Sequence, residues 1–357
     1  MALNDSSLNS QCYMYENDIN FKTYLSIHHA NCQTSNICIE KSSVSYPREN
    51  ATFLMLCRNS DMYEVLQTVQ IVQDRFNNKF NYDYTFLNDE PFTDEFIYLI
   101  SSYITKGKIN FGMIPTEHWW YPSHINQTLA QEIRENFADV PYGNLESYRH
   151  MCRYFSGFFY KHPMVRQYQY YWRIEPNIKL TCDINEDLFK FIKVNDKKYG
   201  FVISLFEYSE TIPTLWSNVL EFIKLKNLKP ELLHALLNDY DWYNLCHFWS
   251  NFEIANLDIF NNNEIYEEFF KFLDSKGGFY YERWGDAPIH TIGLMLSLKK
   301  EDFHWFNQVG YYHPPFSACP QNSKIYLENK CVCDPEDDVN SNNQFSCTNH
   351  FLKLLKG

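Results

Sequence analysis

The stretch Ala51-Thr-Phe-Leu-Met-Leu-Cys57 is a short, continuous apolar run of the kind that forms a strand buried on both faces. Asp61 and Glu64 follow it with the spacing of a capping box, which would fix the first turn of a helix. The apolar residues after Asp61 recur at helical spacing, at Met62, Val65, Leu66, Val69, Val72 and Phe76. A buried strand followed at once by an amphipathic helix predicts the first βα unit of an α/β domain.

The same alternation continues along the chain. The predicted strands are 82–87, 108–114, 168–174 and 199–206, and the predicted helices are 93–104, 147–161, 214–226, 229–237, 263–275 and 286–299. Strands that alternate with helices predict a layered α/β sheet. Ligands of such sheets bind outside the carboxyl ends of the strands, so functional residues are expected there.

One large globular unit is expected to contain most of the 357 residues, because no internal repeat and no Pro- or Gly-rich linker divides the chain. Residues 1–46 are polar, rich in Ser and Asn, and without periodicity, so we expect a stem or a loosely attached segment. Residues 47–320 are predicted to form the main domain. Residues 321–357 are predicted to form a cysteine-containing tail packed against it.

Composition narrows the classes of function. Aromatic residues make up 18% of the chain, and the 27 Tyr among them suit surfaces that are apolar yet able to hydrogen-bond, as sugar-binding sites are. Most of the rings are nonetheless expected in the core. A formal net charge of -13 argues against binding to a nucleic-acid backbone, which requires clustered Lys and Arg. An anionic ligand would need local positive charge, which a bound metal ion can supply.

Among the 11 cysteines, Cys32 and Cys38 lie in the N-terminal stretch and Cys319, Cys331, Cys333 and Cys347 crowd the C-terminal tail, whereas cysteines are sparse in the body between them. This distribution indicates disulfides that fasten the termini in an oxidising compartment, and the odd number leaves at least one thiol unpaired. Zinc binding is the weaker alternative, because Cys331-Val-Cys333 lacks the paired C-x-x-C spacing of structural zinc sites.

Three N-glycosylation sequons, which begin at Asn4, Asn50 and Asn126, agree with a secretory location. No apolar run approaches the roughly 20 residues of a membrane span, and the residues after Met1 lack the pattern of a signal peptide. Because disulfides require export, we expect that a native N-terminal membrane anchor is missing from this chain.

Two glutamates have surroundings that suit catalysis. Glu175 follows a predicted strand, and the Pro-Asn177 turn after it would hold the carboxylate at the strand end. A divalent cation bound there could neutralise a diphosphate leaving group, although an exposed turn glutamate is the simpler interpretation. Glu253 lies among Phe, Trp and Ile, where a buried carboxylate needs a partner or a catalytic task. A structural glutamate that accepts backbone hydrogen bonds is the alternative there.

Two further segments combine aromatic and polar side chains. Gly277-Gly-Phe-Tyr-Tyr-Glu282-Arg-Trp284-Gly-Asp286 suits a sugar-binding loop, in which Asp286 could also cap the following helix. Gly310-Tyr-Tyr-His313-Pro-Pro offers an imidazole, which joins carboxylates around Mn²⁺. A lone histidine before proline is otherwise more often structural than a ligand.

Seven segments, taken together with their sequences and their order along the chain, are more informative than any one of them. The segments are Tyr46-Pro-Arg-Glu-Asn-Ala-Thr, Leu56-Cys-Arg58-Asn-Ser, Tyr148-Arg, Tyr171-Trp-Arg-Ile-Glu175-Pro, His247-Phe-Trp-Ser-Asn-Phe-Glu253-Ile, Arg283-Trp-Gly-Asp286-Ala-Pro-Ile-His and Gly310-Tyr-Tyr-His313. Together they resemble the fungal Golgi α-1,2-mannosyltransferases of glycosyltransferase family 15, over about residues 46 to 320. That resemblance implies an α/β fold of the GT-A type, with a mixed, mostly parallel central sheet flanked by helices.

The resemblance also implies a reaction: transfer of mannose from GDP-mannose to a mannose-terminated glycan or glycoprotein, with Mn²⁺ as cofactor and the α configuration retained. It places the enzyme in the Golgi lumen as a single-pass type II membrane protein. Glu175 and His313 match the metal ligands of the family, and Glu253 matches its proposed nucleophile. The matched donor-binding positions are Arg58, Tyr148, Arg173 and Asn177, and the matched acceptor-binding positions are Tyr142, Trp249, Trp284 and Asp286. Asn177 stands where the family usually has Asp, which removes one charge.

Retention of configuration allows two mechanisms. In one, Glu253 attacks the donor sugar and forms a covalent mannosyl-enzyme; in the other, the acceptor attacks from the leaving-group side and Glu253 stabilises an oxocarbenium-like state. The alternative functions are another retaining hexosyl or mannosylphosphate transfer on the same scaffold, and a non-catalytic glycan-binding protein disabled at Asn177. A glycan-binding protein of that kind would need no Mn²⁺ and would release no GDP.

Overall fold

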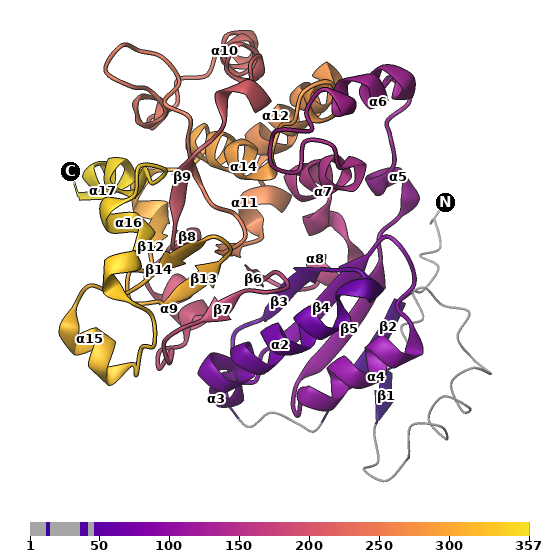
Figure 1. Cartoon of the computed structure of the whole chain (residues 1–357), viewed down its shortest axis with the longest axis vertical. Helices are drawn as coiled ribbons and strands as arrows, with labels where there is room; N and C mark the ends of the chain where they lie inside the picture. The colour runs from indigo at the N-terminus through magenta and orange to yellow at the C-terminus, as the bar shows by residue number, and fades with distance from the viewer. Residues whose placement is uncertain (1–11, 15–35, 42–45, 357) are drawn as a thin grey trace, which may run out of the picture.

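The computed structural model describes residues 12–14, 36–41 and 46–356, with the N-terminal strands at one end of a central sheet (Figure 1). The sheet has nine strands in the order β1-β2-β5-β4-β3-β6-β11-β8-β12. In that order the strands are Cys12–Met14, Asn36–Glu40, Lys108–Met113, Asp83–Asn88, Ala51–Leu56, Tyr170–Arg173, Glu253–Asn256, Tyr199–Phe201 and Phe303–Trp305. The four strands from β5 to β6 run parallel, whereas β11 is antiparallel to both of its neighbours. The predicted mixed, mostly parallel α/β sheet is therefore confirmed.

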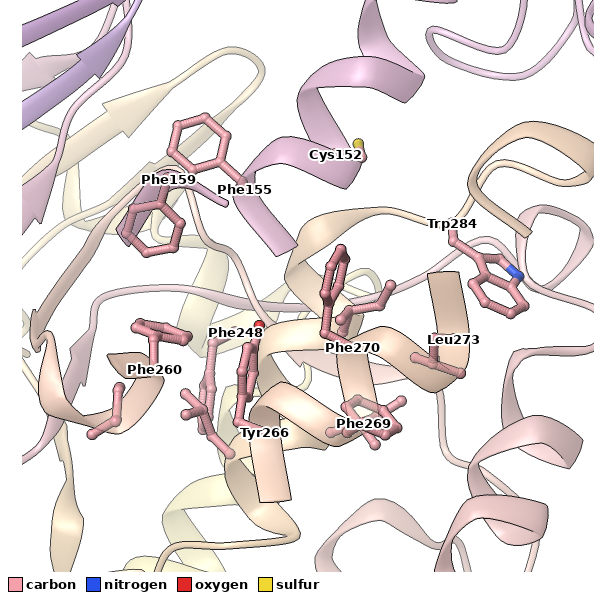
Figure 2. Packing of buried hydrophobic residues seen from close by; sticks show 14 of the residues in the cluster. Cys152, Phe155, Phe159, Phe248, Phe260, Tyr266, Phe269, Phe270, Leu273 and Trp284 are labelled. Carbon is pink, nitrogen blue, oxygen red and sulfur yellow. The ribbon is translucent and has the colours of Figure 1, made fainter. Parts of the chain in front are cut away.

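Helices cover both faces of the sheet, which explains why β3 is apolar throughout. On one face α2 (Met62–Val72), α4 (Asp94–Tyr103) and α9 (Leu188–Val194) share a core cluster with Phe53 and Met55 of β3. On the other face α7 (Glu146–Gly157), α12 (Glu264–Lys276) and α14 (Asp286–Met295) share a cluster with Leu54. Figure 2 shows part of this second cluster, in which rings from α7 (Phe155) and α12 (Tyr266, Phe269 and Phe270) lie near Phe248.

The predicted first βα unit is present, but its cap differs from the prediction. Asp61 does not cap α2: its carboxylate accepts a hydrogen bond from the Arg58 backbone N–H at 2.9 Å, which closes a 3₁₀ turn at Asn59–Asp61. Beyond α2 the chain continues through a π-helical turn, Gln73–Asn77, and α3 (Asn78–Phe80). Thr93 does cap α4 as predicted, because its hydroxyl accepts from the Phe96 N–H.

Two predicted elements are wrong in length. The strand predicted at 199–206 is broken into β8 and β9 (Ser204–Phe206), and β9 leaves the main sheet to pair with β10 (Cys246–Phe248). The helix predicted at 229–237 is a single 3₁₀ turn, Leu233–Leu236, because Leu237 turns outward to bridge Tyr243. The helix predicted at 214–226 is α10 (Leu215–Lys226).

A small third sheet lies beside the carboxyl end of β6. It contains β14 (Phe316–Ala318), β13 (Tyr311–His313) and β7 (Lys179–Leu180). The further helices are α5 (Thr116–Trp119), α6 (Gln127–Glu135), α8 (Pro163–Arg166), α11 (Asp258–Asn261), α13 (Gly278–Tyr281), α15 (Ser323–Glu328), α16 (Val339–Asn342) and α17 (Thr348–Lys356). None of the helices in the described ranges is long and apolar enough to cross a membrane.

The predicted stem begins to be ordered before residue 46. Residues 36–40 form β2, which pairs with β5 and buries Cys38 and Ile39, so the sheet extends into the segment expected to be loosely attached. Most of residues 1–46, including Cys32 and Asn4, lies outside the described residues.

Three disulfides involve cysteines of the C-terminal end, and two of them join the tail to the body, as the cysteine distribution predicted for this end of the chain. They are Cys182–Cys331, Cys246–Cys347 and Cys319–Cys333. Both sulfurs of the Cys331-Val-Cys333 segment are therefore consumed in disulfides, which contradicts the zinc alternative. Each of the two long-range bridges ties the tail to a strand or loop near the sheet, at sequence separations of 149 and 101 residues.

Removing a bridge that closes a long loop should cost more stability than removing one that closes a short loop. We expect the Cys246→Ala/Cys347→Ala variant to lose roughly 4–5 kcal/mol of unfolding free energy and Cys319→Ala/Cys333→Ala roughly 3 kcal/mol. Chemical denaturation under non-reducing conditions measures both losses. An equal or reversed order would contradict this view of how the tail is fastened.

Candidate active site

Arg173, the last residue of β6, is the centre of the candidate site. Its side chain is only 2% exposed. Nη2 donates to Glu175 Oε1 at 2.6 Å, and Nη1 donates to Asp286 Oδ2 at 2.5 Å. The guanidinium carbon lies 3.6 Å from the centroid of the Phe155 ring. Arg173 is the last residue of β6, and β6 runs parallel to β3. The cluster therefore lies at the carboxyl end of the parallel strands, where ligands of α/β sheets bind.

Asp286 reaches this cluster from the start of α14. It is the first helical residue rather than the predicted N-cap, which is Gly285. Its Oδ2 accepts from Arg173 and from the Ser250 hydroxyl at 2.7 Å, so the carboxylate binds side chains and not the helix backbone. Burial raises the pKa of Asp286, but Arg173 and His290 outweigh burial and leave the pKa below its ordinary value. The group is therefore an ionised carboxylate held by a buried cation.

Glu175 and His313 form a pair beside Arg173. His313 ends β13, and its Nε2 lies 3.2 Å from Glu175 Oε2. Its Nδ1 lies 3.0 Å from the carbonyl oxygen of Pro314. The tautomer that donates its Nδ1 proton to this oxygen would leave the lone pair of Nε2 to bind a metal. Burial alone raises the pKa of Glu175, but Arg173 and His313 lower it to about 2. The Glu175 and His313 side chains are 26% and 17% exposed, so both remain accessible.

This pair fits a divalent cation with open positions. Ligand atoms at about 2.1 Å from an octahedral ion lie about 3 Å apart in neighbouring positions, close to the 3.2 Å that separates the two atoms here. Within the described part of the chain, no group of three or more His, Cys, Asp or Glu side chains is arranged to hold a metal. A metal bound here would have two protein ligands and would depend on ligand or water oxygens for the rest.

Asn177 and Trp249 lie beside this pair, whereas the described contact of the Arg58 side chain is with α7. Asn177 is exposed in the turn after Glu175, with a φ of 67° that asparagine tolerates better than most residues, and no hydrogen bond joins its side chain to the pair in the described structure. The Trp249 ring lies 4.9 Å from the His313 ring. Arg58 is exposed and its Nη2 donates to the Ser147 hydroxyl at 2.8 Å.

Glu253 lies opposite Arg173 in the antiparallel ladder between β11 and β6. Its carboxylate is completely buried and accepts hydrogen bonds from the hydroxyls of Tyr171 and Tyr199, each at 2.8 Å, and from His290 Nδ1 at 3.1 Å. Burial lowers the pKa of His290, but Glu253 and Asp286 outweigh burial and raise it. The partners are side chains, which rules out the alternative of a glutamate bound to the backbone. In this conformation no atom of Glu253 can touch a ligand, and its predicted role as a nucleophile stays a prediction.

An arginine and two tyrosines continue the site along α7. Arg283 donates to the Tyr148 hydroxyl at 3.0 Å and to Glu207 at 3.1 Å. Tyr142, which is 54% exposed, stacks on Tyr148 with ring centroids 4.9 Å apart. The sequence reasoning did not select Glu207 or Arg283. Arg283 lies three residues before Asp286 in a segment quoted above, and this position could have identified it as a site residue. Nothing in the sequence around Glu207 identifies that residue as part of the site.

Trp284 is not available to an acceptor. It is 1% exposed and lies in the core cluster that Figure 2 shows, with its indole N–H donating to Glu282 at 2.6 Å. A sugar cannot reach it, so the predicted acceptor role of Trp284 is corrected: the apolar indole packs against Phe279 and closes the core behind Gly278.

A cavity of about 290 Å³ lies away from this cluster, at the edge strand β12. Its lining comprises Lys197, Lys300, Glu301, Phe303, His304, Trp305 and Leu352. None of the predicted site residues contributes to it. The convergence of charged groups at the end of β6, and not this cavity, therefore defines the candidate active site.

Comparisons with known proteins identify the family of this chain. The family model described as glycolipid 2-alpha-mannosyltransferase matches residues 6–356. A probable mannosyltransferase, MNT3 of Candida albicans, is 63% identical over 344 residues, covering 96% of this chain and 90% of that protein. The alpha-1,2 mannosyltransferase KTR1 of Saccharomyces cerevisiae is 48% identical over 328 residues, covering 89% of this chain and 82% of that protein.

Two solved structures share the fold. Core-mannan synthase A from Aspergillus fumigatus, in an Mn/GDP form, has a TM-score of 0.77 at 37% identity, covering 87% of this chain and 84% of that one. The mannosyltransferase Ktr4p of S. cerevisiae, in complex with GDP, has a TM-score of 0.76 at 35% identity, covering 86% and 83%. This chain therefore belongs to glycosyltransferase family 15, the glycolipid 2-alpha-mannosyltransferases, and is a glycosyltransferase.

Proposed function

We propose that this protein is a retaining α-1,2-mannosyltransferase with a fold of the GT-A type, which transfers mannose from GDP-mannose to a mannose-terminated glycan. The observation that carries the proposal is the Glu175–His313 pair beside the buried Arg173, at the carboxyl end of β6. The Mn/GDP form of the related core-mannan synthase supports both the donor and the metal. The three disulfides support a location in the Golgi lumen, because disulfides persist in the secretory pathway.

The metal would be held by Glu175 and His313, and when bound it would supply positive charge to the departing diphosphate. Arg173 fixes Glu175 for this task by a hydrogen bond of 2.6 Å and keeps its carboxylate ionised. The Pro314 carbonyl fixes the ring of His313. Both ligands are thus oriented before the donor arrives, which reduces the reorganisation that binding requires.

The donor and acceptor would bind on either side of this pair. Tyr142 and Tyr148 present stacked rings, joined through Arg283 to Glu207, on the side of α7. Trp249 offers a ring beside His313 on the other side. Aromatic faces of this kind suit a guanine base or the apolar face of a hexose.

The burial of Glu253 favours the second of the two mechanisms that retention allows. A nucleophile must reach the anomeric carbon, but Glu253 has no exposed atom and three hydrogen-bond donors hold its oxygens. Glu253 instead places a negative charge beneath Arg173 and His290, where it fixes the electrostatics of the site. Attack by the acceptor from the leaving-group side, with the diphosphate oxygen taking the acceptor proton, is then the route that this arrangement supports.

Asn177 does not favour the alternative of a disabled, glycan-binding protein. Its side chain makes no hydrogen bond with Glu175 or His313 in the described structure, so the replacement of Asp by Asn leaves the metal pair intact. A mannosylphosphate transferase would use the same donor and metal, and linkage analysis of the product separates the two reactions.

The proposed function predicts a metal-dependent product. Incubation with GDP-mannose, methyl α-mannoside and Mn²⁺ should give an α-1,2-linked disaccharide, identified by mass spectrometry and linkage analysis. Chelation of the metal should abolish both the product and GDP release, and Glu175→Gln should lower the rate by a factor of about 100 because it removes a charged ligand. Product formation that chelation leaves unchanged, or a phosphodiester-linked product, would sink the proposal.

Replacement of Glu253 tests its role without changing its shape. Glu253→Gln should reduce kcat by about a hundredfold, on the order of 3 kcal/mol of transition-state stabilisation. Intact-protein mass spectrometry during turnover of the parent enzyme should show no added hexose, because the proposed route forms no mannosyl-enzyme. Thermal denaturation checks that the variant is folded at the assay temperature, and turnover equal to that of the parent would defeat the assignment.

A further inference from the structure

A short loop that follows α10 and the 3₁₀ turn Leu233–Leu236 carries aromatic side chains that are exposed to solvent. The loop is the Asn238-Asp-Tyr-Asp-Trp242 segment, between the 3₁₀ turn at 233–236 and β10. Tyr240 is 82% exposed and Trp242 is 73% exposed, and no other described aromatic side chain is exposed as much. These two rings, two positions apart in the sequence, form a surface that nothing in the described structure covers.

The backbone of this loop is fixed by its own hydrogen bonds. Asn238 Oδ1 accepts from the backbone N–H groups of Tyr240 at 2.9 Å and Trp242 at 3.1 Å. The Asn238 N–H donates to the Trp242 carbonyl at 2.8 Å, and Asp241 adopts a φ of 60° in the turn. Below the loop, Tyr243 stacks on Trp216 with ring centroids 4.8 Å apart. The exposed rings are therefore presented by an ordered turn on a packed base, which lowers the entropy that binding would cost.

The side chains of the loop suit a neutral saccharide. Tyr240 and Trp242 offer ring faces for the apolar face of a pyranose, and their polar edges can bind hydroxyl groups. The neighbouring Asp239 and Asp241 are exposed and form no ion pair in the described structure, so their oxygens are available to accept from hydroxyls. The segment carries two acidic residues and no basic one, which disfavours phosphorylated or other anionic ligands.

The loop is continuous with the candidate active site. The Glu207 N–H donates to the Leu245 carbonyl at 2.8 Å, so the two chain segments lie side by side where the β9–β10 ladder ends. The Glu207 carboxylate accepts from Arg283, which also donates to Tyr148. Trp242 is three residues from Leu245, at most about 10 Å along the chain. These contacts connect the loop with the Arg283 side of the candidate site, which is the direction in which an acceptor of several sugars would extend to reach it.

We propose that Tyr240 and Trp242 form a secondary subsite for a neutral mannan chain, which binds sugars distant from the one that receives the new mannose. The subsite gives the enzyme a preference for long acceptors over short ones. The identity of the glycan rests on the proposed function, whereas the presence of a saccharide site at the loop rests on the exposed rings and carboxylates alone.

Direct binding tests the subsite independently of transfer. Isothermal titration of the whole protein with an α-mannotetraose, without GDP-mannose, should show binding that the double variant Tyr240→Ala/Trp242→Ala weakens about tenfold. Tyr63→Ala is the matched control, because Tyr63 is 65% exposed on α2, far along the chain from the loop. The double variant is expected to keep the parent melting temperature, since both side chains are largely exposed.

Transfer kinetics provide the second readout. The KM for the tetraose should rise about tenfold in the double variant, while the KM for methyl α-mannoside should stay unchanged. Tetraose binding equal to that of the parent, or an equal rise of KM for both acceptors, would overturn the subsite. If the parent transfers no mannose at all, the proposed function fails, and loss of tetraose binding in the double variant still supports the subsite.

Discussion

The buried guanidinium of Arg173 is the interaction on which the arrangement of the site depends. A cation with 2% of its side chain exposed is stable only when anions and hydrogen-bond acceptors surround it. Glu175 supplies one acceptor from the turn after β6, and Asp286 supplies the other from the start of α14. Residues more than 100 positions apart are thereby held within one cluster. Because each anion compensates part of the buried charge, the packing of α14 against β6 also assembles the site.

Behind Arg173 and its two anions lies a second group of polar side chains, around Glu253, that the solvent does not reach. Glu253 faces Arg173 across the β6–β11 ladder and is bound by Tyr171, Tyr199 and His290. Buried polar networks of this kind are stable only when every member is satisfied, and in return they are rigid. Arg173 can therefore hold Glu175 in a fixed orientation toward a metal. This is the preorganised electrostatic arrangement that a departing diphosphate requires.

Much of the fold could be predicted from the sequence because burial imposes patterns that act locally. The apolar run at 51–57 and the helical spacing after it identify the first βα unit, and Thr93 marks the start of α4. Elements fixed by distant contacts were less predictable. The strand predicted at 199–206 breaks because its second half pairs with β10, and the pairing of Cys182 with Cys331 depends on a fold that spacing alone does not specify.

In the candidate site, too, features that depend on the local sequence were easier to predict than features that depend on distant contacts. A carboxylate after a strand and an imidazole made Glu175 and His313 candidates, and the family resemblance assigned both as metal ligands. The structure brings the two side chains to 3.2 Å. The apolar neighbours of Glu253 indicated that it is buried, whereas the burial of Trp284 could not be seen in the sequence, since it results from helices packed over the sheet. Glu207 was missed because its only functional sign is a contact with Arg283, 76 residues away.

The most direct test of the account is the position of the metal. Crystals grown with Mn²⁺ and GDP, measured at a wavelength where manganese scatters anomalously, locate the ion without reference to any enzymatic assay. The account predicts one strong anomalous peak within bonding distance of Glu175 and of His313 Nε2, with the diphosphate completing its coordination. A manganese peak on another face of the sheet, or GDP bound away from this pair, would contradict it.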